Sequence, residues 1–362
     1  MRQLALGVSF AVLFLGTASF LATRISIVQD VIVRKAIESR LTEQRHALFE
    51  PDALRALFCG TSSPAPDPRR AKACVAVFAA GRFWLVDTGP GSWNTLGALG
   101  VDPSRIGGVL LTHFHSDHIG DLGETNLQTW TAGRPAALDV YGPPGVEQVV
   151  AGFVQAYALD SQYRVTHHGA LFMPPELGQM NAVVIPHPKY GEGPSAVFVE
   201  DGLRITAFPV RHDPVKPAYG YRFDYLGRSL VVSGDTAKSP SLVEASTGVD
   251  VLIHEAMAKH MTAAIGEIAA DVERPRIETL MADIPGYHTS AVRAARIANE
   301  TGAKLLLMYH LFPAPPNGIA KSVFTRGVSD LRRGAWELAD DGMLVTLPSA
   351  SEEVLTERLP LR

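Results

Sequence analysis

The stretch from Thr112 to Gly120 holds three histidines and one aspartate, all between positions 113 and 118. It closes an apolar run that starts at Ile106 and predicts a buried strand. Because side chains alternate along a strand, His113 and His115 are expected on the same side, where both imidazoles can bind one ion. The end of this strand is therefore predicted to be a metal site.

Asp117 and His118 follow where the chain is expected to turn, since Gly120 marks a bend. They approach from the opposite side, so one strand end can serve two metal ions. A lone histidine is more often a surface or core residue than a ligand, and the chain has 12. That structural interpretation applies to the histidines away from such motifs: His46, His167, His168, His187 and His260.

Length and charge limit the class of protein. With 362 residues and 46% hydrophobic content, the chain can bury the core of one large or two small domains. Its formal net charge of -4 provides no basic surface for a polyanion. Charge therefore does not suggest nucleic acid as a partner.

The N-terminus carries twenty residues without a charge, from Leu4 to Thr23. This length spans a bilayer and also suits an export signal, so residues 1–24 are predicted to be a membrane anchor or a signal segment, with an anchor preferred. Basic residues that follow the span favour a cytoplasmic body, whereas the very short tail before it favours export. We expect a membrane-anchored protein on the exported side, with secretion after cleavage as the alternative.

The rest of the chain divides by its hydrophobic pattern. Short β-type runs with Gly- and Pro-rich turns begin after Pro51, and strands alternate with helices in the second half. The predicted elements there include a strand from Tyr219 to Tyr225 and a helix from Ala291 to Thr301 that Ser290 caps. The predicted division is a helical spacer over 25–50, one domain over 51–350 and a C-terminal tail over 351–362. The two cysteines, Cys59 and Cys74, are expected in or beside neighbouring strands, and both a disulfide and two buried thiols are compatible with this placement.

Three later residues stand at predicted strand ends beside turn signals: His212, Asp235 and His310. His212 precedes Asp213-Pro214, and Asp235 lies in the turn Ser233-Gly234-Asp235-Thr236. Each signal is modest alone. Together they complete the nitrogen and oxygen ligands that a dinuclear site needs.

With these residues in place, the sequence resembles the metallo-β-lactamase superfamily, and within it the ribonuclease Z-like branch, over about residues 54–347. The resemblance depends on motifs in matching order: Phe58-Cys59-Gly60-Thr61 with Pro64 and Asp67-Pro68-Arg69-Arg70, Asp87-Thr88-Gly89, Thr112 to His118, His212 with Gly220-Tyr221, Ser233 to Thr236, His254-Glu255-Ala256, His288-Thr289-Ser290 and His310. It implies an α/β fold of the αββα four-layer sandwich type.

The resemblance also implies a ligand set. One metal is held by His113, His115 and His212, and the other by Asp117, His118 and His310, with Asp235 as the bridge between them and Asp87 orienting the cluster. The cofactor is expected to be two divalent ions, zinc first, with manganese or iron as alternatives.

The same resemblance implies a mechanism. The nucleophile is expected to be a hydroxide bound by both metals. His288, oriented by Glu255, is the candidate that protonates the leaving group, with Asp117 as a further catalytic residue beside it. A helix-capping role for His288, ahead of Thr289 and Ser290, is the alternative.

Ribonuclease Z recognises transfer RNA with a basic, glycine-rich arm between the first histidine cluster and the third histidine ligand. In this chain the interval from Asp160 to Glu200 carries two basic and four acidic residues, a local charge of -2. Phosphate polymers bind through several Lys or Arg contacts. Met257 in place of the usual threonine, and the inverted Thr289-Ser290, are further departures. No nucleic-acid partner is expected.

The predicted function is metal-dependent hydrolysis of a small-molecule substrate, with a small phosphodiester preferred. A lactone, ester, sulfate ester or haloaromatic compound remains an alternative, since the walls of a pocket select the substrate. A non-catalytic metal-binding protein at the membrane is the rival from another class. A homodimer also stays open.

Overall fold

The computed structural model describes residues 23–42, 45–186 and 194–360. The chain forms two compact units, of which the first ends at Arg45 and contains helix α2 (Ser26–Thr42). The second, His46–Arg362, is the body of the protein. The predicted membrane segment at 4–23 lies almost wholly outside the described residues. None of the described helices is both long enough and apolar enough to cross a membrane.

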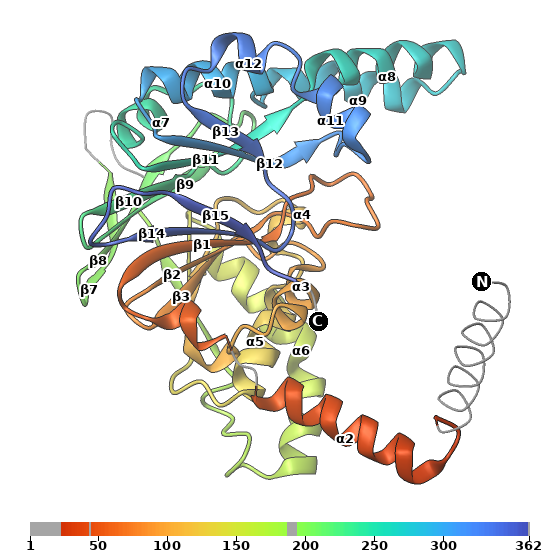
Figure 1. Cartoon of the computed structure of the whole chain (residues 1–362), viewed down its shortest axis with the longest axis vertical. Coiled ribbons are helices and arrows are strands. Elements are labelled where there is room, and N and C mark those ends of the chain that lie inside the picture. The colour runs from red at the N-terminus through yellow and green to blue at the C-terminus, as the bar shows by residue number, and fades with distance from the viewer. Residues whose placement is uncertain (1–22, 43–44, 187–193, 361–362) are drawn as a thin grey trace, which may run out of the picture. The chain divides into compact units, whose positions relative to one another are not determined.

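The first sheet of the body has eight strands in the order β15-β14-β1-β2-β3-β4-β5-β6 (Figure 1). Their bounds are β1 (Ala53–Gly60), β2 (Cys74–Ala79), β3 (Arg82–Val86), β4 (Ile106–Leu110), β5 (Leu138–Gly142), β6 (Met180–Val184), β14 (Met343–Pro348) and β15 (Leu355–Arg358). The strands β3, β4, β5 and β6 run parallel. Their carboxyl ends therefore meet at one edge.

The second sheet has seven strands in the order β13-β12-β11-β10-β9-β8-β7. Their bounds are β7 (Ser195–Glu200), β8 (Leu203–Pro209), β9 (Tyr219–Tyr225), β10 (Arg228–Val232), β11 (Val251–Met257), β12 (Leu305–Phe312) and β13 (Ala335–Leu338). The strands β10, β11, β12 and β13 are parallel. Buried residues of both sheets, among them Trp84, Tyr221 and Leu307, form one core between them.

Helices cover the outer face of each sheet, and a separate hydrophobic core lies between each sheet and its helices. In Figure 1, α3, α5 and α6 lie beyond the first sheet, and α7, α10 and α12 beyond the second. The helix bounds are α3 (Ser92–Ala98), α4 (Ser116–Ile119), α5 (Leu122–Thr131), α6 (Val146–His168), α7 (Pro240–Ala245), α8 (Lys259–Asp271), α9 (Pro275–Asp283), α10 (Ala291–Glu300), α11 (Gly318–Phe324) and α12 (Val328–Leu331). Short 3₁₀ turns are η1 (His46–Phe49), η2 (Pro103–Arg105) and η3 (Ile284–Gly286). The predicted αββα sandwich is confirmed.

Two predicted boundaries differ from the structure. The segment 351–362 was expected to be a separate tail, but β15 within it pairs antiparallel with β14 and extends the first sheet. The spacer was expected to run to residue 50, but Leu48 and Phe49 are buried in the body, where Phe49 packs on Phe78 with ring centroids 5.3 Å apart. The C-terminal segment joins the body because the backbone of β15 pairs with β14, and the end of the spacer joins it because Leu48 and Phe49 are buried there.

Cys59 on β1 and Cys74 on β2 form a disulfide, which resolves the open question about these two residues. The two strands are antiparallel neighbours, so their Cα atoms are only 5.0 Å apart. The bond closes the loop between them, in which the Thr61 carbonyl oxygen accepts from the amide of Leu311, the residue after His310, at 2.9 Å. It therefore links the base of this loop to the core.

Replacing both Cys59 and Cys74 with alanine is expected to lower the free energy of unfolding by about 3 kcal/mol, because a 15-residue cross-link restricts the unfolded chain by about that amount. Chemical denaturation of the variant and of the wild type, with and without reductant, measures the difference. Reductant should weaken only the wild type. A variant as stable as the oxidised protein would contradict the expectation.

Candidate metal centre

The first four histidine and aspartate side chains come from one segment, the loop after β4 together with α4. β4 ends at Leu110, so His113 and His115 lie in the following loop and not on the strand as predicted. Asp117 and His118 lie on the one-turn helix α4 and not in an open turn. The early end of the strand does not separate the two histidines, because the tight turn into α4 still brings their rings together.

His212 and Asp235 come from the second sheet, each just beyond a strand. His212 follows β8 and donates from Nδ1 to the carbonyl oxygen of Tyr287, 3.2 Å away. Asp235 follows β10 after Gly234, which has a φ of 61°. β8 and β10 run in the same direction, because each pairs antiparallel with β9. Both residues therefore lie at the same edge of the sandwich, as the turn signals predicted.

His310 reaches the cluster through a β-bulge. In the pairing of β11 with β12, Glu255 faces Tyr309 and Ala256 faces Leu311, so His310 has no partner in the ladder. Its φ of 46° is in the left-handed region, which is uncommon for a residue other than glycine. A bulge turns a side chain away from the regular alternation. The prediction placed His310 at the strand end, whereas the strand continues to Phe312.

The first ligand group consists of His113, His115, His212 and Asp235, whose candidate ligand atoms all lie within 4.8 Å of one another. The His113 Nε2 and His115 Nδ1 atoms are 2.9 Å apart, and His212 Nε2 is 3.4 Å from His115 Nδ1. His115 is exposed, whereas the other three are buried. The group is thus open to solvent on one side.

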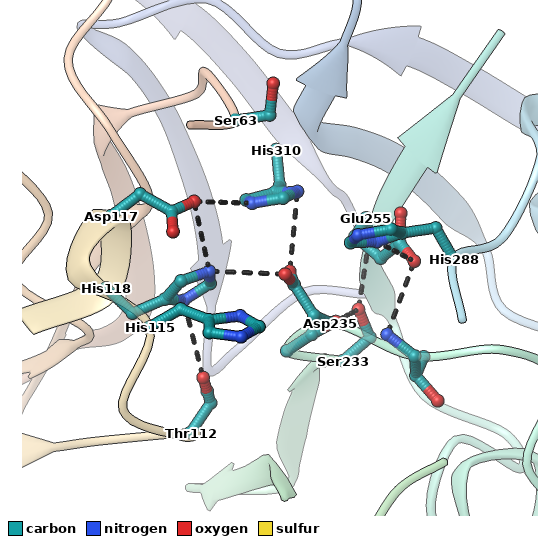
Figure 2. A network of polar contacts seen from close by, with 12 residues as sticks. Ser63, Thr112, His115, Asp117, His118, Ser233, Asp235, Glu255, His288 and His310 are labelled. Atoms are coloured by element: carbon teal, nitrogen blue, oxygen red, sulfur yellow. Dashed lines mark hydrogen bonds and ion pairs between the residues drawn. The ribbon is translucent and has the colours of Figure 1, made fainter. Parts of the chain in front are cut away.

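The second group consists of Asp117, His118 and His310 (Figure 2). Asp117 Oδ2 lies 3.1 Å from His310 Nε2 and 3.5 Å from His118 Nε2. Asp235 stands between the two groups, with Oδ2 3.9 Å from His113 Nε2 of the first group and 3.3 Å from His118 Nε2 of the second. The structure therefore brings all seven predicted ligands together, and their roles as ligands stay a prediction.

These residues fit two divalent cations. Among the described residues, three buried atoms of the cluster lack a hydrogen-bond partner: His118 Nε2, His310 Nδ1 and Asp235 Oδ1. Buried polar atoms are rarely left without a partner, so these three atoms indicate a missing ligand. Imidazole nitrogens and carboxylate oxygens are donors suited to zinc, manganese and iron.

The surrounding charges favour protonation states that suit a metal site. Burial lowers the pKa of His113, His115 and His212, which keeps their imidazoles neutral and able to bind a cation. Burial by itself raises the pKa of Asp235, but His310 and His118 outweigh it and hold the pKa well below its usual range. Asp235 is therefore a carboxylate.

Asp87, at the end of β3, orients the cluster as the motif suggested. Its Oδ2 atom accepts from His118 Nδ1 at 2.7 Å and from the Thr112 hydroxyl at 2.9 Å, and its Oδ1 accepts from the Thr112 amide at 2.8 Å. This contact leaves His118 Nε2 facing Asp235. A carboxylate behind a histidine is the usual means of fixing the orientation of a ligand ring.

His288 and Glu255 form a pair beside the cluster (Figure 2). His288 Nδ1 is 3.1 Å from Glu255 Oε1, and the same oxygen accepts the backbone amides of Thr289 at 2.8 Å and Thr236 at 3.3 Å. Burial by itself lowers the pKa of His288, but the Glu255 carboxylate raises it to about 9. The His288 ring stacks on His310 with centroids 5.7 Å apart, so it lies next to the cluster.

Tyr287 was not predicted as a site residue, yet it touches two of them. Its carbonyl oxygen fixes His212, and its ring centroid lies 5.4 Å from that of His212 and 4.8 Å from that of His288. The segment before His288 carries no motif that marks this contact. Only its position immediately ahead of His288 was a signal.

Gly234→Ala is expected to displace Asp235 and to reduce both metal content and stability, the latter by about 1–2 kcal/mol from the backbone conformation alone. A Cβ atom at this position would lie 2.6 Å from the Tyr219 carbonyl oxygen. Elemental analysis and thermal unfolding of the purified variant test this. Gly248→Ala, which also has positive φ but meets nothing within 4 Å, is the control and should keep its metal.

Comparison with known proteins agrees with the fold and the ligand motifs. Residues 82–311 match the family described as the beta-lactamase superfamily domain. The chain is 36% identical over 258 residues to ribonuclease Z of Mycobacterium avium and 37% identical over 258 residues to that of Mycobacterium marinum. Each alignment covers 70% of this chain and 85% of the relative.

Two solved structures share the fold. The metallo-beta-lactamase fold protein YhfI from Bacillus subtilis has a TM-score of 0.58 at 20% identity and covers 82% of this chain and 99% of its own. The short form of human tRNase Z has a TM-score of 0.57 at 19% identity and covers 81% and 99%. The chain therefore belongs to the metallo-β-lactamase superfamily of hydrolases, among its ribonuclease Z-like members.

Proposed function

We propose that the protein is a metal-dependent phosphodiesterase that acts on a small phosphodiester. The observation that carries this proposal is the His288–Glu255 pair next to the seven-residue cluster. Two divalent cations, zinc first, supply an activated water and stabilise negative charge on the attacked phosphoryl group. His113, His115 and His212 would hold one ion and Asp117, His118 and His310 the other, with Asp235 shared.

The protein side chains then provide orientation and a proton. Because Nδ1 of His288 faces Glu255, Nε2 is the atom available to the leaving group. Glu255 keeps His288 protonated, and its contacts with Thr289 and Thr236 hold the carboxylate in place. A positioned acid of this kind contributes about 10²–10⁴-fold to the rate, most for a leaving group of high pKa.

The preference for a small substrate is supported by the segment between the two histidine motifs. From Asp160 to Glu200 the chain has a local charge of -2, and its described part contains the end of α6, β6 and β7. A polyanion needs several basic contacts, and this stretch offers only Arg164 and Lys189. Arg164 is also paired with Asp160 at 2.8 Å.

The purified full-length protein tests the proposal. We expect about two divalent ions per chain by elemental analysis and turnover of bis(p-nitrophenyl) phosphate that is lost on chelation and restored by zinc. A panel of lactones, esters, sulfate esters and haloaromatic compounds covers the alternative substrates. Stoichiometric metal with no turnover of any of them would favour the non-catalytic metal-binding rival.

RNA is the second candidate substrate, because relatives with 36–37% identity are named ribonuclease Z. Precursor transfer RNA with a 3′ trailer, incubated under the same metal conditions, separates the two candidates. Cleavage at the trailer junction that is faster than turnover of the small diester would support the RNA substrate and reject the small one.

We also propose that the body lies on the exported side of the membrane. The support comes from the disulfide between Cys59 and Cys74, a bond that persists in oxidising compartments, and from the uncharged stretch Leu4 to Thr23. Thiol alkylation of acid-quenched cells under denaturing conditions tests it. Both cysteines should react only after reduction, and reaction without reductant would place the body in the cytosol.

A further inference from the structure

A cavity of about 430 Å³ lies on the outer, helical side of the second sheet, beside Met257 at the end of β11. It is bounded by the start of α8, the start of α10 and the end of α11, three helices that lie on the same side of that sheet in Figure 1. Its lining residues are Met257, Ala258, Lys259, His260, Ala263, Ser290, Ala291, Val292, Phe324 and Arg326. None of the seven predicted metal ligands is among them.

The floor of the cavity is apolar and its rim is cationic. Met257 and Phe324 are buried, at 2% and 1% exposure, whereas Lys259 and Arg326 are exposed. No acidic residue is part of the described lining. Within the described part of the chain, neither Lys259 nor Arg326 forms an ion pair or a side-chain hydrogen bond. The two positive charges are therefore free to bind an anion.

Two other cavities of similar size differ in this respect. The cavity of about 480 Å³ at the opposite end of the strands contains Arg82, which pairs with Asp201 at 2.8 Å. The cavity of about 570 Å³ beside the Pro66–Lys72 loop contains Arg69, which pairs with Asp67 at 3.2 Å. Both cavities also have acidic residues in their lining, Glu200 in the first and Asp341 in the second. The cavity at α8 and α10 lacks such a partner.

We propose that this cavity is a second ligand site, separate from the metal centre, that binds a small organic anion with an apolar body. Its volume is within the range of small-molecule sites. Lys259 and Arg326 would bind the anionic group, and His260 adds a hydrogen-bond donor at the rim. Met257, Val292 and Phe324 would contact the apolar part. The N-terminal ends of α8 and α10 belong to the lining of the cavity, and their helix dipoles add partial positive charge there.

The cavity also has a direct connection to the catalytic segment. The backbone amide of Met257 donates to the carbonyl oxygen of Thr289 at 2.9 Å, and Met257 pairs with Ser290 in a short parallel bridge. Thr289 is bound in turn to Glu255. A ligand in the cavity would thus contact Met257 and Ser290, the second of which lies two residues beyond His288, without entering the metal centre.

Calorimetric titration of the full-length protein with 2-naphthalenesulfonate, a permanently charged probe, tests the site. The neutral 2-naphthalenesulfonamide has the same shape and serves as the matched probe. We expect the sulfonate to bind at one site per chain and the sulfonamide to bind at least about tenfold more weakly, since one charged hydrogen bond accounts for that much affinity.

Two variants of the cavity are expected to weaken sulfonate binding at least about tenfold. K259Q/R326Q removes both charges, and Ala263→Trp fills the space from an exposed position on α8. The double variant R296Q/R333Q, which removes two exposed charges elsewhere, is the control and should bind as the wild type does. Thermal unfolding confirms that each variant is folded.

Three results would overturn the proposal. Undiminished sulfonate binding in both cavity variants would place the anion elsewhere, at the metal centre first. Equal binding of the neutral sulfonamide would remove the role of the two cations. An equal loss in the control variant would indicate a general effect of surface charge. None of these results depends on hydrolytic activity, so the proposed function is tested separately.

Discussion

Asp235→Ala is expected to lower turnover of a phosphodiester by roughly 10³-fold or more and to reduce the bound metal to one ion or fewer per chain. Asp235 is the carboxylate that lies near both groups, with Oδ2 3.9 Å from His113 Nε2 in the first and 3.3 Å from His118 Nε2 in the second. It is buried at 2% exposure, so water has little access to replace it. Elemental analysis and initial rates on the purified variant measure the two losses.

Two further variants make this result interpretable. Asp117→Ala removes a carboxylate from only one ligand group, so it is expected to abolish most turnover while more metal is retained than in Asp235→Ala. Asp330→Ala removes an exposed carboxylate on α12 and should change neither quantity. Full metal content and wild-type rates in Asp235→Ala would exclude this residue from the metal centre.

His288→Ala is expected to keep the metal content and to slow hydrolysis by about 10²–10⁴-fold for diesters with an alkyl alcohol as the leaving group. For p-nitrophenyl esters the loss should be much smaller, because p-nitrophenolate leaves without a proton. The His288 ring packs on His310, and its candidate ligand atom lies within 4.8 Å of those of Asp235 and His310, while its Nδ1 is bound to Glu255. Parallel rates on the two classes of diester provide the measurement.

Glu255→Gln is the companion variant. The amide oxygen can still accept from Thr289 and Thr236, so the loop should persist, whereas the charge that favours protonated His288 is lost. A smaller loss with the same dependence on the leaving group is expected. An equal loss on activated and poor leaving groups in His288→Ala would indicate that the residue acts structurally, as the helix-capping alternative holds.

Local patterns predicted much of the fold. Strand β9 has the predicted bounds, Tyr219–Tyr225, because its apolar residues alternate and glycine and charged residues follow it. Helix α10 begins after Ser290, whose side chain accepts from the Arg293 amide, as its capping position predicted. Such features depend on neighbours within a few residues, so they are readable without the fold.

Other features could not be predicted in this way. The bulge that turns His310 into the cluster depends on how β11 pairs with β12, and no local residue signals it. The contact of Tyr287 with His212 joins residues 75 positions apart. Strand β4 ends before the histidines because the chain must turn into α4, although the apolar run continues to Leu111.

The stretch from Thr112 to Gly120, with His212, Asp235 and His310 beyond it, already predicted from the sequence alone which residues could bind metal. Ligand chemistry is a property of residue types, and strand ends are marked by local turns. Only the tertiary structure decided that these residues meet at one edge, that Asp235 stands between the two groups, and that a cationic cavity lies among α8, α10 and α11. Those relations depend on the register and packing of two sheets, which couple residues about 200 positions apart.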